Sequence, residues 1–187
     1  MSSQRSGSSW AMGVADDGVV TIGDPRLKAH TTMVGPAEAG ELLQTLTTRL
    51  RDLRGAGLAA PQIGVSVRAA VVEVRKTEVF PDRPETGLIQ LVDPVVVERS
   101  DETVLDWEGC FSVPGYMGQV SRAEHLTVRY TTETGETVTR EFTGYPARVV
   151  QHEIDHLDGV VYLDRMADLT SLTTTQNYLD HHRPASG

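Results

Sequence analysis

The chain has 187 residues, a length that suits one domain large enough to bury a hydrophobic core. Its 17 Lys and Arg residues against 26 Asp and Glu residues give a formal net charge of -9. This charge argues against a nucleic-acid-binding surface, which normally carries a basic stripe. No apolar run approaches the length that spans a bilayer, and the single cysteine forms no internal disulfide, which fits a reducing cytosol. We therefore expect a cytoplasmic protein without direct nucleic-acid or membrane binding.

The two ends of the chain differ in composition from its middle. Residues 1–18 are rich in serine and lack the apolar segment of a secretory signal, so we predict a disordered N-terminal extension. The following segment, 19–170, is predicted to be the folded domain. Residues 171–187 are predicted to be a C-terminal tail that is helical in part.

The first half of the predicted domain reads as a helix followed by a strand. Pro36 suits the first helical position, and Gly55 and Gly57 end the pattern. Apolar residues recur at the helical period and predict one buried face: Leu42, Leu43, Leu46, Leu50 and Leu53. A buried strand is predicted over 67–74, and the Pro- and Gly-containing stretch 81–87 is predicted to be a loop.

The second half is predicted to contain strands and one further long helix. Strands are expected at 89–92 and 95–99, and Glu133-Thr134-Gly135 predicts a hairpin between alternating segments at 126–130 and 137–142. The helix starts near Pro146 and ends before Gly159, with one apolar stripe formed by Val150, Ile154 and Leu157. Together these elements predict an α+β single domain.

This second helix carries the segment His152-Glu153-Ile154-Asp155-His156. Residues four apart lie on one helical face, so both imidazoles can reach one metal ion. Glu153 is then free to handle protons near a water that the metal activates. The alternative for the isolated pattern is a pair of histidines that merely pack at a helix surface.

Cys110, the only cysteine, lies in the segment Glu108-Gly109-Cys110-Phe111-Ser112. On its own such a residue is most often an inert buried thiol. Its position just before Val113-Pro114-Gly115 predicts a loop that aims the side chain at a partner. As a thiolate it would complete a Cys-His-His site with an open fourth position, an arrangement typical of metal-assisted hydrolysis.

A third segment, 55–64, contains three glycines, a proline and Gln62. It could simply be a turn between the predicted helix and strand. Beside a catalytic site it has a second use, because glycine lets a substrate backbone approach closely and an amide side chain can donate to a developing oxyanion.

These three segments, at 55–62, 108–112 and 151–156, closely resemble the polypeptide (peptide) deformylases. That family carries Gly-x-Gly-Leu-Ala-Ala-x-Gln, Glu-Gly-Cys-x-Ser and Gln-His-Glu-x-Asp-His segments in this order. The resemblance extends from about Ile22 to Asp168, and it implies strands wrapped around a central helix that bears the histidine motif. It also implies that 19–170 is a catalytic domain.

The resemblance implies a metal-dependent hydrolase that removes the formyl group from the N-formylmethionine of newly made polypeptides and releases formate. Its partners would be N-formylmethionyl nascent peptides, including chains at the ribosome. The divalent metal would be Fe(II), with Zn(II), Ni(II) or Co(II) as substitutes. The residues that carry over are the metal ligands Cys110, His152 and His156, the proton carrier Glu153, the oxyanion donors Gln62 and the Phe111 backbone N–H, and the substrate-binding residues Gly57, Ala56 and Glu108.

Three departures from the family pattern concern the substrate pocket rather than the metal. Ala56 replaces a larger aliphatic residue and would widen the pocket for the methionine side chain. Ser121 replaces a common proline, and Trp107 either borders the cleft or serves packing. An ion pair between Glu108 and Arg122 is a further hypothesis, set against two unrelated surface charges.

Two other functions stay open at this point. A zinc peptidase could use the same histidine helix, but it would recruit a third ligand downstream, where no convincing context exists. A non-catalytic peptide- or metal-binding relative could keep the fold, although it would be expected to have lost Glu153 or Gln62. The sequence does not decide between iron and zinc.

Overall fold

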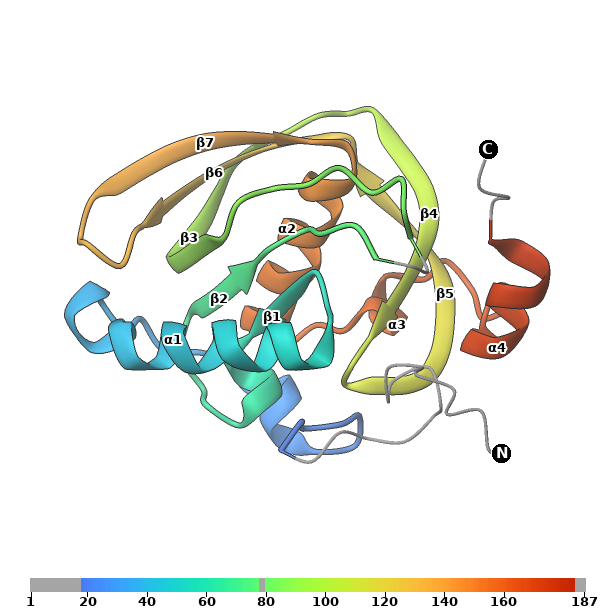
Figure 1. The fold of residues 1–187 in the computed structure, drawn as a ribbon, viewed down its shortest axis with the longest axis horizontal. Helices are drawn as coiled ribbons and strands as arrows, with labels where there is room; N and C mark the ends of the chain where they lie inside the picture. The colour runs from blue at the N-terminus through green and yellow to red at the C-terminus, as the bar shows by residue number, and fades with distance from the viewer. Residues whose placement is uncertain (1–17, 78–79, 184–187) are drawn as a thin grey trace, which may run out of the picture.

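The computed structural model describes residues 18–77 and 80–183, and their strands form two antiparallel sheets (Figure 1). The larger sheet has the order β1-β2-β3-β6-β7 and the smaller one β4-β5-β8. The strands are β1 (Gly57–Ala59), β2 (Ala69–Val72), β3 (Ile89–Arg99), β4 (Thr103–Cys110), β5 (Val113–Ala123), β6 (His125–Thr131), β7 (Thr137–Thr143) and β8 (Thr173–Thr174). The helical elements are η2 (Pro25–Lys28), α1 (Pro36–Leu53), η3 (Ala60–Ile63), α2 (Gly144–Leu157), α3 (Tyr162–Arg165), α4 (Thr175–Asn177) and η4 (Tyr178–His182).

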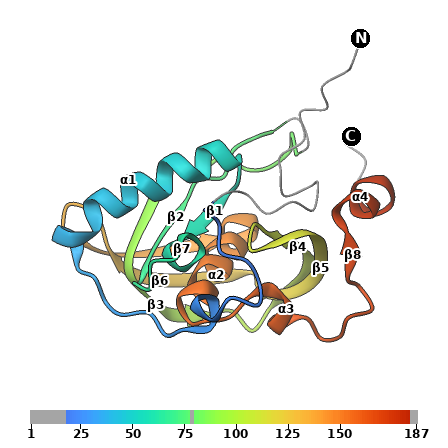
Figure 2. The ribbon, with the colours of Figure 1, turned by 90° about the horizontal axis from the view of Figure 1, so that it is seen from below.

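Helices α1 and α2 lie on opposite sides of the larger sheet (Figure 2). The side chains of β2 alternate between them, as the period of a strand requires. Ala69 and Val71 pack in one apolar cluster with α1, whereas Val72 packs in another with Ile154 of α2. Helix α2 also contacts β5, β6 and β7, so strands surround it. The predicted α+β fold around a central histidine-bearing helix is confirmed.

The predicted helix over 36–53 is present as α1. Pro36 occupies the start of the helix, and Arg54 caps the end in the left-handed conformation with a φ of 57°. The leucines of the predicted stripe at 43, 46, 50 and 53 are buried, and Leu42 is partly buried against the same cluster. Burial of this apolar stripe against the sheet, more than helix propensity, holds α1 in place.

The strands predicted at 89–92 and 95–99 are one continuous strand, β3. The register shifts between Val92 and Val95, and Asp93 has a φ of 50°. The Asp93 carboxylate compensates by accepting hydrogen bonds from the backbone N–H groups of Val34 and Gly35, at 3.1 and 3.2 Å. The strand predicted over 67–74 is shorter and spans 69–72 as β2.

The expectation that Cys110 lies in a loop is wrong. Cys110 is the last residue of β4, and Phe111 and Ser112 form a tight turn into β5. The two strands pair from Thr103↔Ala123 to Gly109↔Met117, with a register shift before Cys110. Strand geometry therefore aims the thiol, which gives it a more rigid support than a loop would.

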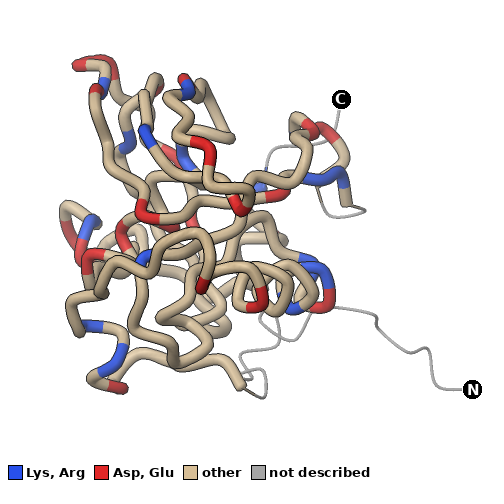
Figure 3. The backbone as a smooth tube through the Cα atoms, turned by 90° about the vertical axis from the view of Figure 1, so that its left-hand side faces the viewer, with Lys and Arg blue, Asp and Glu red and all other residues tan. Residues whose placement is uncertain are grey.

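The predicted C-terminal tail contains structure as far as His182. Strand β8 pairs with Tyr116 and Met117 of β5, and the Tyr178 ring lies 5.3 Å from the Trp107 ring. The predicted disordered extension lies outside the described residues, except for Gly18. Acidic and basic residues are interspersed along the described chain (Figure 3). No helix in the described part of the chain is both long and apolar enough to cross a bilayer.

Candidate metal centre and substrate cavity

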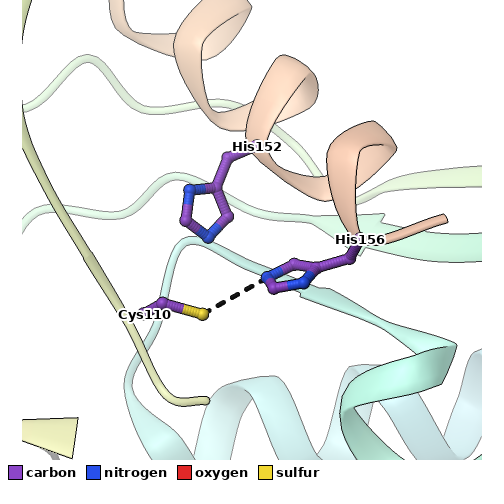
Figure 4. A group of neighbouring side chains, drawn as sticks. All are labelled: Cys110, His152 and His156. Atoms are coloured by element: carbon purple, nitrogen blue, oxygen red, sulfur yellow. Dashed lines mark hydrogen bonds between the residues drawn. The ribbon is translucent and has the colours of Figure 1, made fainter. Parts of the chain in front are cut away.

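Cys110, His152 and His156 come together where the end of β4 meets α2 (Figure 4). One ligand atom from each side chain lies within 4.8 Å of the others, and Cys110 Sγ is 3.2 Å from His156 Nε2. Cys110 and His156 are buried and His152 is partly buried. A thiolate and two imidazoles at this separation form a donor set that suits zinc or iron.

Glu108 orients the first histidine. Its Oε2 lies 2.9 Å from His152 Nδ1, which leaves Nε2 as the nitrogen available to a metal. Burial alone would lower the pKa of His152, but the neighbouring Cys110 and Glu108 raise it well above its ordinary value. Burial, and then the charge of His152, lowers the pKa of His156 well below its ordinary value, which favours the neutral, metal-binding form of that ring.

A buried ion-pair cluster, Glu108–Arg122–Arg148–Asp155, stands behind this histidine. Arg122 donates to Glu108 at 2.8 Å and to Asp155 at 2.5 Å, and Arg148 donates to Glu108 at 2.7 Å. Burial would raise the pKa of Glu108, but the hydrogen bonds from Arg122 and His152 bring it far below its ordinary value. The hypothesised pair of Glu108 and Arg122 is confirmed, and its arginine side chain is only 5% exposed.

Glu153 projects from α2 toward β1 and is 3% exposed. Burial raises its pKa from 4.5 to about 7. Among the described side chains, its Oε2 is a buried atom with no hydrogen-bond partner. Gly57 is required beside it, because a Cβ at that position would lie 2.3 Å from Glu153 Oε1. The segment 55–62 and the histidine segment 151–156 therefore pack closely against one another beside the metal ligands.

Gln62 lies in η3 and is 1% exposed. Its Oε1 accepts a hydrogen bond from the Ala59 N–H at 2.8 Å, which fixes the orientation of the amide. The Nε2 group consequently points toward Cys110 Sγ and Ser112 Oγ, each at 3.4 Å. Phe111 lies between these two residues in the turn from β4 to β5, and its ring packs where a Cβ of Gly55 would stand. The structure therefore brings the three predicted motifs into one site.

A cavity of about 540 Å³ opens onto this site. The predicted substrate residues Gly57, Ala56 and Glu108 line it, and so does Trp107, which also packs against Tyr178 and His182. Glu108 has both carboxylate oxygens in hydrogen bonds to other side chains. The cavity is also lined by residues outside the three motifs, among them Phe80, Arg83, Tyr145 and Leu179.

An α+β domain with a buried Cys-His-His group, a carboxyl group of raised pKa beside it and a cavity in front defines a metallohydrolase. Residues 17–171 match the family described as Polypeptide deformylase. The chain belongs to that family, and it is an enzyme of the peptide deformylase class.

Relatives and solved structures cover most of the chain. It is 42% identical to "Peptide deformylase" of Thermomicrobium roseum, over 82% of this chain and 88% of the relative. It is 40% identical to "Peptide deformylase 1" of Nitrosomonas europaea, over 81% and 88% of the two chains. The class I type b peptide deformylase of Acinetobacter baumannii, solved with Met-Ala-Ser bound, superimposes with a TM-score of 0.76 at 38% identity, covering 79% of this chain and 96% of that one.

Family membership removes the support for the two other functions considered from sequence. The third candidate ligand is Cys110, upstream of the histidine helix, rather than a downstream residue of the kind a zinc peptidase recruits. Glu153 and Gln62, whose loss would mark a non-catalytic relative, both lie at the site.

Proposed function

We propose that this enzyme acts on N-formylmethionyl polypeptides through Glu153, Gln62 and a metal held by Cys110, His152 and His156. The reaction adds water across the formamide C–N bond, so that formate leaves and the methionine amine becomes free. The observation that carries the proposal is the meeting of three separate elements, β4, α2 and β1, around one buried carboxyl group.

The residues fit one divalent ion. Three donor atoms lie within 4.8 Å of one another, and the donor set leaves a position for a further ligand. We propose Fe(II) as the native metal, with Zn(II), Ni(II) and Co(II) as substitutes, because thiolate and imidazole ligands accept all four. When bound, such an ion would lower the pKa of water toward about 7, which would supply a nucleophile at neutral pH.

Glu153 is assigned the proton transfers. A pKa of about 7 lets the carboxylate accept a proton from the attacking water and, as the acid, return it to the departing amine nitrogen. The Oε2 atom, which has no partner among the described side chains, is the proposed site of this proton. The proton that Glu153 takes from water is the one the amine receives, and the second water proton leaves on formic acid, which ionises to formate in solution.

Gln62 Nε2 and the Phe111 backbone N–H are assigned to the oxyanion that develops on the formyl carbonyl. The amide is already oriented by the Ala59 N–H, so little reorganisation is needed in the transition state. Removing one such donor typically raises the barrier by about 2.7–4 kcal/mol.

Gly57 and Ala56 are assigned to the substrate wall, where the peptide backbone would lie alongside β1 in the manner of an added strand. For Glu108 the hydrogen bonds favour a different role from direct substrate binding. With its oxygens held by Arg122, Arg148 and His152, it serves best as the group that positions the His152 ring.

The deformylase family acts on N-formylmethionyl nascent peptides. We place this enzyme in the cytoplasm with nascent chains at the ribosome as its substrates, without direct contacts to nucleic acid. The net charge of -9 supports the absence of nucleic-acid contacts. The domain assignment, with 19–170 as the catalytic unit between an extension and a tail, belongs to the same proposal.

A formate-release assay on formyl-Met-Ala-Ser with anaerobically purified protein tests the proposed reaction. Formate and free Met-Ala-Ser should appear in equal amounts, and a Glu153→Ala variant should give the background rate. The proposal fails if the wild-type protein, loaded with metal, releases no more formate than that variant.

A further inference from the structure

Arg83 lies at the cavity wall, where two aromatic rings hold its guanidinium group. Its guanidinium carbon lies 3.7 Å from the centre of the Phe80 ring and 4.7 Å from that of Tyr145. Stacking of this kind fixes the guanidinium plane and leaves its N–H edge available to a planar anion. All three side chains line the cavity that contains Glu153 and the metal ligands.

Within the described part of the chain, no carboxylate lies within 4.0 Å of the Arg83 guanidinium nitrogens. This contrasts with Arg122 and Arg148, two buried arginines behind the metal centre, which are both held by Glu108. Arg83 therefore has its geometry fixed by aromatic rings while its hydrogen-bonding capacity toward a carboxylate is unused.

The charged residues at the outer part of the cavity share one sign. Arg54 and Lys76 are exposed there, and Arg75 and Arg83 are partly buried. The acidic residues lining the cavity, Glu108 and Glu153, lie on its inner side and are buried.

The acidic residues near this rim in the described chain do not line the cavity, and Asp82 and Glu85, which flank Arg83 in the sequence, are exposed. Glu73 is hydrogen bonded to Arg51 at 2.8 Å and lies 3.7 Å from Arg75. The charge of Asp106 raises the pKa of Tyr145 and the charge of Arg83 lowers it, but Asp106 does not line the cavity. A cationic mouth on a chain of net charge -9 is a local feature that the overall charge opposes.

We propose that Arg83, assisted by Arg54, Arg75 and Lys76, binds a carboxylate on the substrate peptide and gives the enzyme a preference for formylmethionyl peptides with an acidic residue soon after the methionine. This inference rests on the proposed deformylase function and names a substrate class within it. A peptide side chain fits better than a nucleic-acid phosphate, because the guanidinium lies in an aromatic-lined cavity beside the reacting groups rather than on an open face.

The test compares peptides that differ only in charge. Formyl-Met-Glu-Ser-amide is paired with formyl-Met-Gln-Ser-amide, and formyl-Met-Ala-Glu-amide with formyl-Met-Ala-Gln-amide, so that the blocked C-terminus adds no second carboxylate. The ratio of kcat/KM for Glu over Gln is measured within each pair. We expect a ratio of about fivefold to tenfold in at least one pair, carried mainly by KM, and a decline of that ratio as salt is raised.

The matched variants are Arg83→Met and Arg140→Met. Arg140 makes the same kind of contact, 5.0 Å over the Phe142 ring, but on β7 and outside the cavity. Arg83→Met should bring the Glu-over-Gln ratio close to one, whereas Arg140→Met should keep the wild-type ratio. Because each ratio is taken within one protein sample, partial unfolding of a variant cancels.

The outcomes separate this proposal from the proposed function. Formate release from the Gln peptides with no preference for Glu in either pair would overturn the carboxylate site and leave the deformylase function intact. A Glu-over-Gln ratio that is the same in Arg83→Met as in the wild-type protein would also overturn it. So would a variant that binds a single-stranded RNA oligonucleotide more weakly than the wild-type protein but keeps the wild-type ratio. Failure to release formate from any peptide would instead contradict the proposed function.

Discussion

One side of helix α2 packs in the apolar core, and the other side carries residues of the site. On one side Val150 and Ile154 pack in the apolar cluster with β2, β3 and β6, and Leu157 packs against Ala59 and Ala70. On the other side His152, Glu153 and Asp155 face Cys110, the cavity and the buried arginines. The comparison shows that a site built from costly buried polar groups needs a helix that is anchored independently by its apolar side.

Glu153→Ala tests the polar side with the largest expected effect. Loss of the proposed proton carrier should lower kcat by about 10²–10⁴-fold. The bound metal and the melting temperature should be retained, because the substitution removes a buried carboxyl atom that has no partner among the described side chains. Formate release, metal content and thermal unfolding measured on one preparation check this expectation. The exposed Glu38 of α1 offers a matched control, since Glu38→Ala should change none of the three.

Gln62→Leu should leave metal binding intact and lower turnover by about 10²–10³-fold, since one oxyanion donor is lost. Gln44→Leu, on the exposed side of α1, is the control for the change of side chain. Turnover within twofold of wild type in Gln62→Leu would refute the assigned role of the amide.

Arg122→Met tests whether the ion-pair cluster stabilises the folded protein in addition to positioning the site residues. It removes the partner that Glu108 and Asp155 share, so we expect the free energy of unfolding to fall by about 3 kcal/mol. Urea unfolding with and without metal gives this value. An unchanged unfolding midpoint would show that Arg148 and Arg165 alone satisfy the two carboxylates.

Ile154→Val tests the apolar side with the smallest effect. Ile154 is 3% exposed, and removal of one methylene group from this cluster should lower the free energy of unfolding by about 0.5–1.5 kcal/mol. The rate per folded molecule should not change, although Glu153 is the adjacent residue. A loss of turnover comparable to that of Gln62→Leu would contradict the separation of the two sides.

The site residues that could be predicted from the sequence are those that lie in short local motifs. Spacing along one helix placed His152 and His156 together, the segments around Cys110 and Gln62 marked those two residues as candidates, and the resemblance to a family then implied their roles. The predicted apolar stripes of α1 and α2 were also found, because a helical period is visible over many residues.

The sequence missed features that depend on contacts between distant segments. Strand β4 escaped prediction because its first four residues are exposed on both faces, so they show no alternation of polar and apolar residues. Strand β3 was divided in two because Asp93 and Pro94 carry a turn signal, which the hydrogen bonds of Asp93 to Val34 and Gly35 override. Arg83 and Leu179 reach the cavity from a loop and from the C-terminal segment, and no local motif marks either.

We propose that one divalent metal, held by Cys110, His152 and His156, serves the hydrolysis that Glu153 assists. The most direct measurement restores Fe(II) stepwise and anaerobically to metal-stripped protein while formate release from formyl-Met-Ala-Ser is recorded. Activity should rise linearly and level off at one equivalent of metal per chain, and Cys110→Ala should not reach that plateau. Full activity without metal, or the same titration curve in Cys110→Ala, would contradict the claim.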